Sequence, residues 1–70
     1  MDKKQLGQNA GVVWKTLYHQ RLSWEELLKS TGLNPLELAG AIGWLAREDK
    51  IAMMLQNSIL YFETYHECYY

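Results

Sequence analysis

The apolar residues between positions 34 and 51 follow a helical spacing that changes abruptly into alternation. Four of them recur at the intervals of one helix face: Leu38, Ala41, Ile42 and Leu45. Asn34 is a favourable N-cap residue, and Pro35 suits the first helical position, where no backbone N–H is needed. Arg47 lies near the C-terminal end, where positive charge is favoured. The pattern predicts a helix over 35–48 that runs directly into a strand.

Two further helices are predicted upstream. The first, over 6–20, carries one apolar stripe: Leu6, Ala10, Val13 and Leu17. The second, over 24–31, follows Ser23, which forms a capping box with Glu26, since each side chain can bind the other residue's backbone N–H. Gly32 suits the left-handed residue that ends a helix. Two helices joined by this short Gly-Leu-Asn turn form a helix-turn-helix arrangement.

Gly7 and Gly11 lie four residues apart and therefore share a face of the first predicted helix. Each of them weakens a helix by about 1 kcal/mol relative to alanine. Either the pair allows another backbone to approach closely, or it only loosens the first turns of the helix. Of these two interpretations we favour close packing.

After Lys50 the apolar period becomes two, which predicts strands over 51–56 and 59–64. Asn57-Ser58 suits a two-residue turn between them. The resulting hairpin has one apolar face, which we expect to point inward onto the helices. In it Met53 lies opposite Phe62 and Leu55 opposite Leu60, with Ile51 beside them. Upstream, Arg21-Leu22 is long enough only for a single bridge to a sheet edge.

The opposite face of the hairpin is also largely apolar, because it carries Met54, Ile59 and Tyr61. A two-stranded ribbon cannot bury both of its faces on so small a helical core. A further element should therefore cover this second face. The aromatic tail, 65–70, is a candidate cover, either from the same chain or from another copy.

The composition adds an argument for self-association. Of 70 residues, 49% are hydrophobic, and three Trp and five Tyr are among them. We expect a single domain over 1–70, and a domain of this size buries only about 60% of its unfolded surface. Some of the apolar side chains should therefore remain exposed on the surface, and their exposure favours a homodimer. The interface candidates are apolar or aromatic residues outside the expected core: Leu36, Trp44, Met54, Ile59, Tyr61, Tyr65 and Tyr69.

The order helix, short strand, helix, turn, helix and hairpin is that of winged helix-turn-helix domains. Segments 9–14 (NAGVVW) and 41–47 (AIGWLAR) together resemble a small bacterial winged helix-turn-helix family of uncharacterised function. Segment 22–27 (LSWEEL) resembles the usual opening of the second helix in such domains. The expected fold is mainly α with a small β-hairpin, that is, three helices plus a two- to three-stranded antiparallel wing. The resemblance covers nearly the whole chain and implies a regulatory protein.

The charge pattern gives DNA binding little support. The net charge is −1 and the isoelectric point is near 6.0, whereas DNA-binding domains usually carry a basic excess. No Lys or Arg occurs from 51 to 70. The expected outward face of the third helix has one strong donor, Arg47, among Leu36, Glu37, Gly40, Gly43 and Trp44. The DNA-contact candidates would have to cluster at one end of the helix pair: Lys29, Arg47 and Lys50.

Two functions therefore stay open. The first is a homodimeric winged helix-turn-helix module that binds double-stranded DNA and regulates transcription. The second is a protein-interaction or dimerisation adaptor that makes no DNA contacts. The first function requires a helix that reads the DNA groove and a positively charged wing. The second function requires exposed apolar side chains that can anchor a protein partner.

Other residues indicate no reaction chemistry. Cys68 is the single cysteine, so no intrachain disulfide is possible, and this fits a reducing compartment. His66 and Cys68 are too few for a closed zinc site, and capping accounts for Glu26 in the adjacent pair with Glu25. We expect no enzymatic activity, cofactor, metal or small-molecule site. Without a secretory leader or an apolar run of about 20 residues, we expect a cytoplasmic protein that does not contact a membrane.

Overall fold

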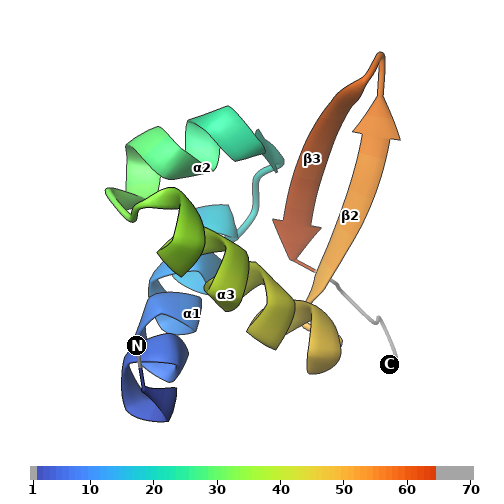
Figure 1. The fold of residues 1–70 in the computed structure, drawn as a ribbon. Helices are drawn as coiled ribbons and strands as arrows, with labels where there is room; N and C mark the ends of the chain where they lie inside the picture. The colour runs from blue at the N-terminus through green and yellow to red at the C-terminus, as the bar shows by residue number, and fades with distance from the viewer. Residues whose placement is uncertain (1, 65–70) are drawn as a thin grey trace.

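The computed structural model describes residues 2–64, which form three α-helices and a three-stranded antiparallel sheet (Figure 1). The elements in chain order are α1 (Lys3–Leu17), β1 (Leu22–Ser23), α2 (Trp24–Thr31), α3 (Pro35–Arg47), β2 (Ile51–Gln56) and β3 (Ile59–Thr64). The strand order is β1-β3-β2, so β3 is the central strand. This is the winged helix-turn-helix architecture predicted from the sequence, and β2 with β3 forms its wing.

Local capping sets the boundaries of the helix pair. The Ser23 hydroxyl accepts the backbone N–H of Glu26 at 3.2 Å, and the Glu26 carboxylate accepts that of Ser23 at 2.8 Å. This confirms the predicted capping box. Gly32 ends α2 with a φ of 74°, the left-handed conformation expected of it. Because both signals are local, they could be identified from the sequence.

Helix α1 begins and ends three residues earlier than the predicted 6–20. Its N-cap is Asp2, whose carboxylate accepts the backbone N–H of Gln5 at 2.8 Å. At the other end His19 has a φ of 64°, which a continuing helix does not allow. The sequence prediction followed the apolar stripe from Leu6 and therefore missed the polar first turn.

The wing has the predicted register. Met53 lies opposite Phe62 and Leu55 opposite Leu60. The short strand expected at Arg21-Leu22 lies one residue later, at Leu22–Ser23, and pairs twice with β3: Leu22 is opposite Phe62 and Ser23 opposite Tyr61. The connecting residues Asn57 and Ser58 both have positive φ, at 51° and 67°. Positive φ at both central positions defines a type I′ turn, whose twist matches that of the two strands.

Only the base of the wing reaches the core. The core consists of side chains from the helices and from the base of the hairpin: Ala10, Val13, Leu17, Leu27, Leu38, Ala41, Ile42, Leu45, Ile51 and Phe62. On the same face of the wing, Met53, Leu55 and Leu60 are 50%, 71% and 40% exposed. The hairpin extends beyond the helices in Figure 1. The expectation that the whole apolar face packs on the core is therefore wrong.

The turn generates the first testable prediction. Ser58 has a side chain in the left-handed region, which costs an L-residue about 1–2 kcal/mol, whereas glycine adopts it freely. We expect Ser58→Gly to raise the free energy of unfolding by about 0.5–1 kcal/mol, after the greater unfolded-state entropy of glycine is subtracted. Urea unfolding measures this change. The matched control, Ser30→Gly within α2, should lower the same quantity, and an equal loss in both variants would contradict the turn assignment.

Candidate interaction surfaces

The exposed face of α3 offers little that could read a base edge. Its exposed positions are Pro35, Leu36, Ala39, Gly43 and Arg47. Of these, Arg47 alone has a side-chain hydrogen-bond donor. Reading DNA in the major groove depends on donors and acceptors that reach the base edges. The middle of this helix presents small and apolar groups instead, which suit contact with another protein surface.

Glu37, which we expected on the outward face, is a capping residue. Its carboxylate accepts the backbone N–H of Asn34 at 3.1 Å, and the Asn34 side chain accepts that of Glu37 at 2.8 Å. Asn34 and Glu37 thus form a second capping box, and the Glu37 side chain is half-buried. The three-residue spacing is visible in the sequence and could have revealed this role. The Glu37 carboxylate therefore caps the start of α3 and is not available to contact a base.

Trp44 does not stand free on the outward face, because it is half-buried against the core. A Cβ atom added at Gly7 would lie 3.9 Å from Cζ2 of the Trp44 indole. A hollow of about 350 Å³ lies between α1 and α3, and Gly7, Gly11, Trp14 and Trp44 are among its lining residues. Nothing lies within 4 Å of a Cβ added at Gly11. No backbone of the described residues 2–64 therefore approaches the two glycines closely, and the favoured interpretation of close packing is wrong for this part of the chain.

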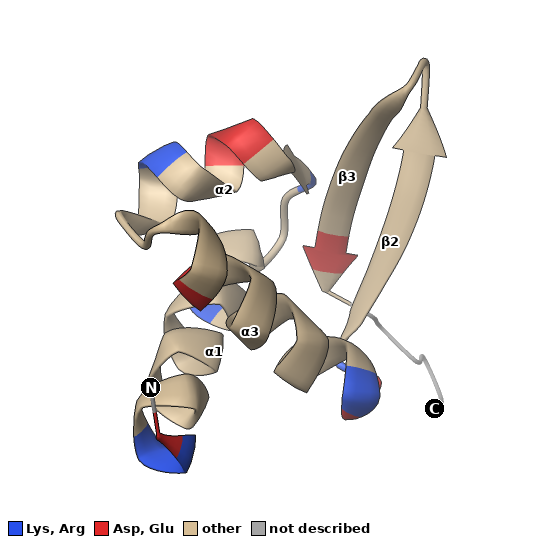
Figure 2. Cartoon of the chain, in the orientation of Figure 1, with Lys and Arg blue, Asp and Glu red and all other residues tan. Residues whose placement is uncertain are grey.

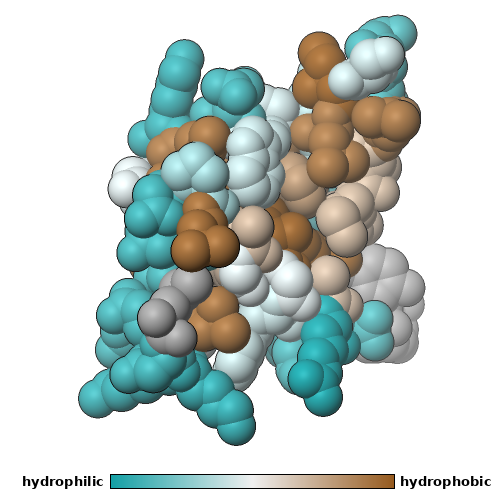
Figure 3. Space-filling view, viewed as in Figure 1, coloured by the Kyte–Doolittle hydropathy of each residue, from teal (hydrophilic) through white to brown (hydrophobic). Residues whose placement is uncertain are grey.

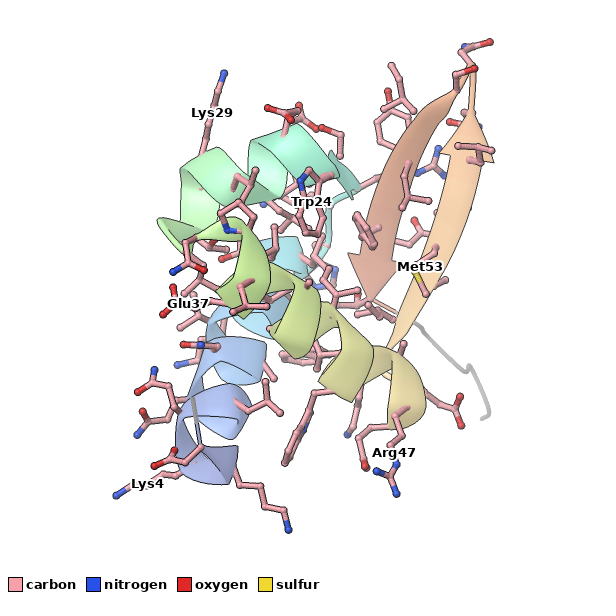
Figure 4. The ribbon with its side chains drawn as sticks, viewed as in Figure 1. Lys4, Trp24, Lys29, Glu37, Arg47 and Met53 are labelled. Atoms are coloured by element: carbon pink, nitrogen blue, oxygen red, sulfur yellow. The ribbon has the colours of Figure 1, made fainter. Side chains whose placement is uncertain are left out.

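The basic candidates do not form one cluster. Lys29 projects from α2 and Arg47 from the far end of α3, on opposite sides of the molecule in Figure 4. Lys50 follows α3 immediately and is exposed. Phosphate binding would require these three residues to cluster at one end of the helix pair. They do not cluster there.

A different basic residue does lie near Arg47. Lys3, Gly43, Arg47 and Glu48 are among the residues that line a surface hollow of about 420 Å³. Lys3 comes from the first turn of α1, so no spacing in the sequence links it to the end of α3. The proximity of Lys3 to Arg47 therefore cannot be predicted from the sequence. Glu48 borders the same hollow and partly offsets its positive charge.

The wing presents an exposed apolar surface. Hydrophobic side chains gather over β2 and β3 in Figure 3, and Figure 2 shows no Lys or Arg on either strand. The large exposed apolar residues of the wing are Met53, Leu55, Ile59 and Leu60. Of these, only Ile59 is a candidate named from the sequence. The other three lie on the face that the sequence predicts to point inward, because periodicity identifies a face without showing how far the core extends.

Polar side chains shield part of the second face of the wing. Arg21 lies 3.7 Å from the carboxylate of Glu63 and donates to the Gln56 side chain at 3.2 Å. By alternation, Glu63 and Gln56 share their face with Met54 and Tyr61, both of which are half-buried. Because Arg21 bridges this face, Met54 and Tyr61 are less available for an interface than expected. The candidates Tyr65 and Tyr69 lie outside the described residues.

Residues 2–64 hold no group of three or more His, Cys, Asp or Glu side chains that could bind a metal ion. In the same range, no helix has the length and apolar character needed to cross a bilayer. The His66 and Cys68 pair lies outside this range.

Comparison with known proteins supports the architecture. Residues 1–64 match the winged helix-turn-helix domain family DUF2582. The chain is also similar to protein BT2368 from Bacteroides thetaiotaomicron, whose structure was solved by solution NMR. The two are 38% identical with a TM-score of 0.82, over 91% of this chain and 79% of that one. No curated protein matches the chain.

The glycine geometry generates the second testable prediction. Gly11 lies inside α1 with open space around its Cβ position, so Gly11→Ala should raise the free energy of unfolding by about 1 kcal/mol. Gly7→Ala should also be stabilising, because its new contact with Trp44 is an ordinary van der Waals distance. Thermal unfolding measures both changes. Gly32→Ala is the matched control, and it should lower stability because of its positive φ. Destabilisation by Gly11→Ala would show that a partner approaches this face.

Proposed function

The chain belongs to the winged helix-turn-helix domain family DUF2582, and we propose that it acts as a homodimeric regulatory module whose wing makes protein contacts. The observation that carries the proposal is the exposed surface of the wing. Four large apolar side chains are exposed there, and residues 51–64 include no Lys or Arg. A wing that follows a DNA backbone needs positive charge, whereas a protein interface needs apolar anchors.

The exposed face of α3 supports the same proposal. Its central positions, Ala39 and Gly43, have no side-chain donors. A helix of this kind can pack closely against another protein but has few means of distinguishing base pairs. The role proposed is binding.

The third testable prediction concerns Leu55, which is 71% exposed on β2. Burying it contributes about 1.5 kcal/mol, so a two-fold contact that contains two copies loses about 3 kcal/mol in Leu55→Lys. We therefore expect the dimer Kd to rise by about 100-fold. Sedimentation equilibrium over a range of protein concentrations measures this constant.

The matched control is Leu36→Lys, because Leu36 is equally exposed but lies on α3. This variant should dimerise like the unmodified chain. The proposal would be overturned if the unmodified chain stayed monomeric at concentrations up to about 100 µM, because even a weak dimer would form in that range. Dissociation by Leu36→Lys alone would move the interface from the wing to α3.

A second candidate function is binding to double-stranded DNA. The observation that favours it is the hollow beside Lys3 and Arg47, on the helix that enters the major groove in winged-helix regulators. A dimer would present this pair twice. The count of phosphate contacts nevertheless stays small, and affinity for DNA depends strongly on that count.

The fourth testable prediction separates the two functions. We expect a fluorescent random-sequence duplex to show no anisotropy change with up to about 50 µM protein at low salt, because few cations lie on one face. Binding in this range that Arg47→Ala weakens, and that the distant Lys29→Ala does not, would instead favour the DNA-binding function.

A further inference from the structure

Strand β2 is an edge strand. The sheet order β1-β3-β2 places β3 between the other two, so β2 pairs along one side only within residues 2–64. Figure 1 shows β2 on the outer side of the wing, away from the helices. An unpaired strand edge carries a row of backbone N–H and C=O groups that can bind another strand.

The hairpin turn determines which of these groups point outward. Gln56 and Ile59 flank the two-residue turn, so they form the hydrogen-bonded pair that closes it. Hydrogen-bonded and non-hydrogen-bonded pairs alternate along antiparallel strands. The peptide groups of Met54 and Ala52 therefore also point toward β3. Those of Ile51, Met53 and Leu55 point toward the open edge.

This edge has none of the features that usually prevent strand addition. Soluble proteins protect their edges with charged side chains, proline, bulges or very short strands. Strand β2 spans six residues, Ile51–Gln56, and contains no charged residue and no proline. Its pairing with β3 runs without a bulge through all six positions. Among residues 2–64, no strand covers this edge, and it is thus open to a further strand.

We propose that two copies of this chain pair antiparallel along β2, about a two-fold axis at Met53, and so form a continuous six-stranded sheet. The axis position follows from the direction of the peptide groups. An axis at Met53 pairs all three outward-pointing residues, because Met53 meets the partner's Met53 and Ile51 meets the partner's Leu55. An axis at a neighbouring residue pairs fewer of them. This inference rests on the proposed homodimer and specifies its geometry.

The side chains of this register are compatible with a second copy. Ala52 lies opposite the partner's Met54, and Lys50 lies opposite the partner's Gln56, so no like charges meet. The exposed apolar face that includes Met53 and Leu55 continues across the axis into the same face of the partner. Two identical antiparallel strands satisfy each other reciprocally, and the contact closes after two subunits. A net charge of only −1 per chain adds little repulsion.

Disulfide trapping tests this geometry in a Cys68→Ser background. Paired residues on antiparallel strands have Cα atoms about 5.5 Å apart, within the range that a disulfide spans. We therefore expect Met53→Cys to form a disulfide-linked dimer on mild oxidation. Gln56→Cys is the matched control, because Gln56 is an exposed polar residue on the same strand. In this register the two copies of position 56 would lie about six residues apart along the sheet, which is too far for a disulfide, so cross-linking should be at least about tenfold slower.

Met53→Pro provides a second test, because it removes an N–H that points to the open edge and no bond to β3. It should be monomeric where the unmodified chain and Met53→Ala are dimeric, and its circular dichroism should be unchanged. Trapping at position 53 together with loss of the dimer in Met53→Pro supports the inference. A dimer by sedimentation without trapping at position 53 overturns the β2 pairing and leaves the homodimer intact. A monomeric unmodified chain overturns both.

Discussion

The packing of Phe62 at the base of the wing is the contact on which the rest of the structure depends. Its side chain is 1% exposed, lies 6.5 Å from the Trp24 ring between centroids, and is opposite Leu22 and Met53 in the sheet. It therefore joins β1, β2 and α2 to one core. A core built from so few residues ends here, and the outer half of the wing extends beyond it with its apolar side chains exposed.

The same limit explains why the surface suits a protein partner better than a nucleic acid. Helix α3 uses Asn34 and Glu37 to cap itself, and Trp44 to pack against α1, which leaves Arg47 as the donor on its exposed face. On the wing, Arg21 is held by Glu63 and Gln56. The surface that remains is apolar and lies along an open strand edge. Pairing between copies would remove the strand edge from water and bring the apolar side chains of the two wings side by side.

Local signals in the sequence were sufficient for most of the fold. The Ser23 capping box, the left-handed Gly32 and the Asn57-Ser58 turn each depend on a few adjacent residues, and the strand register followed from the turn. The exposure of Met53 and Leu55 could not be predicted this way. Alternation shows which face a residue occupies, but the end of the core depends on where distant helices lie. For the same reason the proximity of Lys3 and Arg47 was missed.

Amide hydrogen exchange tests the central claim most directly, because Met53 and Met54 are neighbours whose N–H groups point to opposite sides of β2. Our account predicts that the Met54 amide is protected by β3 at every protein concentration, and that protection of the Met53 amide rises as the concentration increases. If the Met53 amide exchanges rapidly at all concentrations while Met54 stays protected, the edge of β2 is free in solution and the account is contradicted.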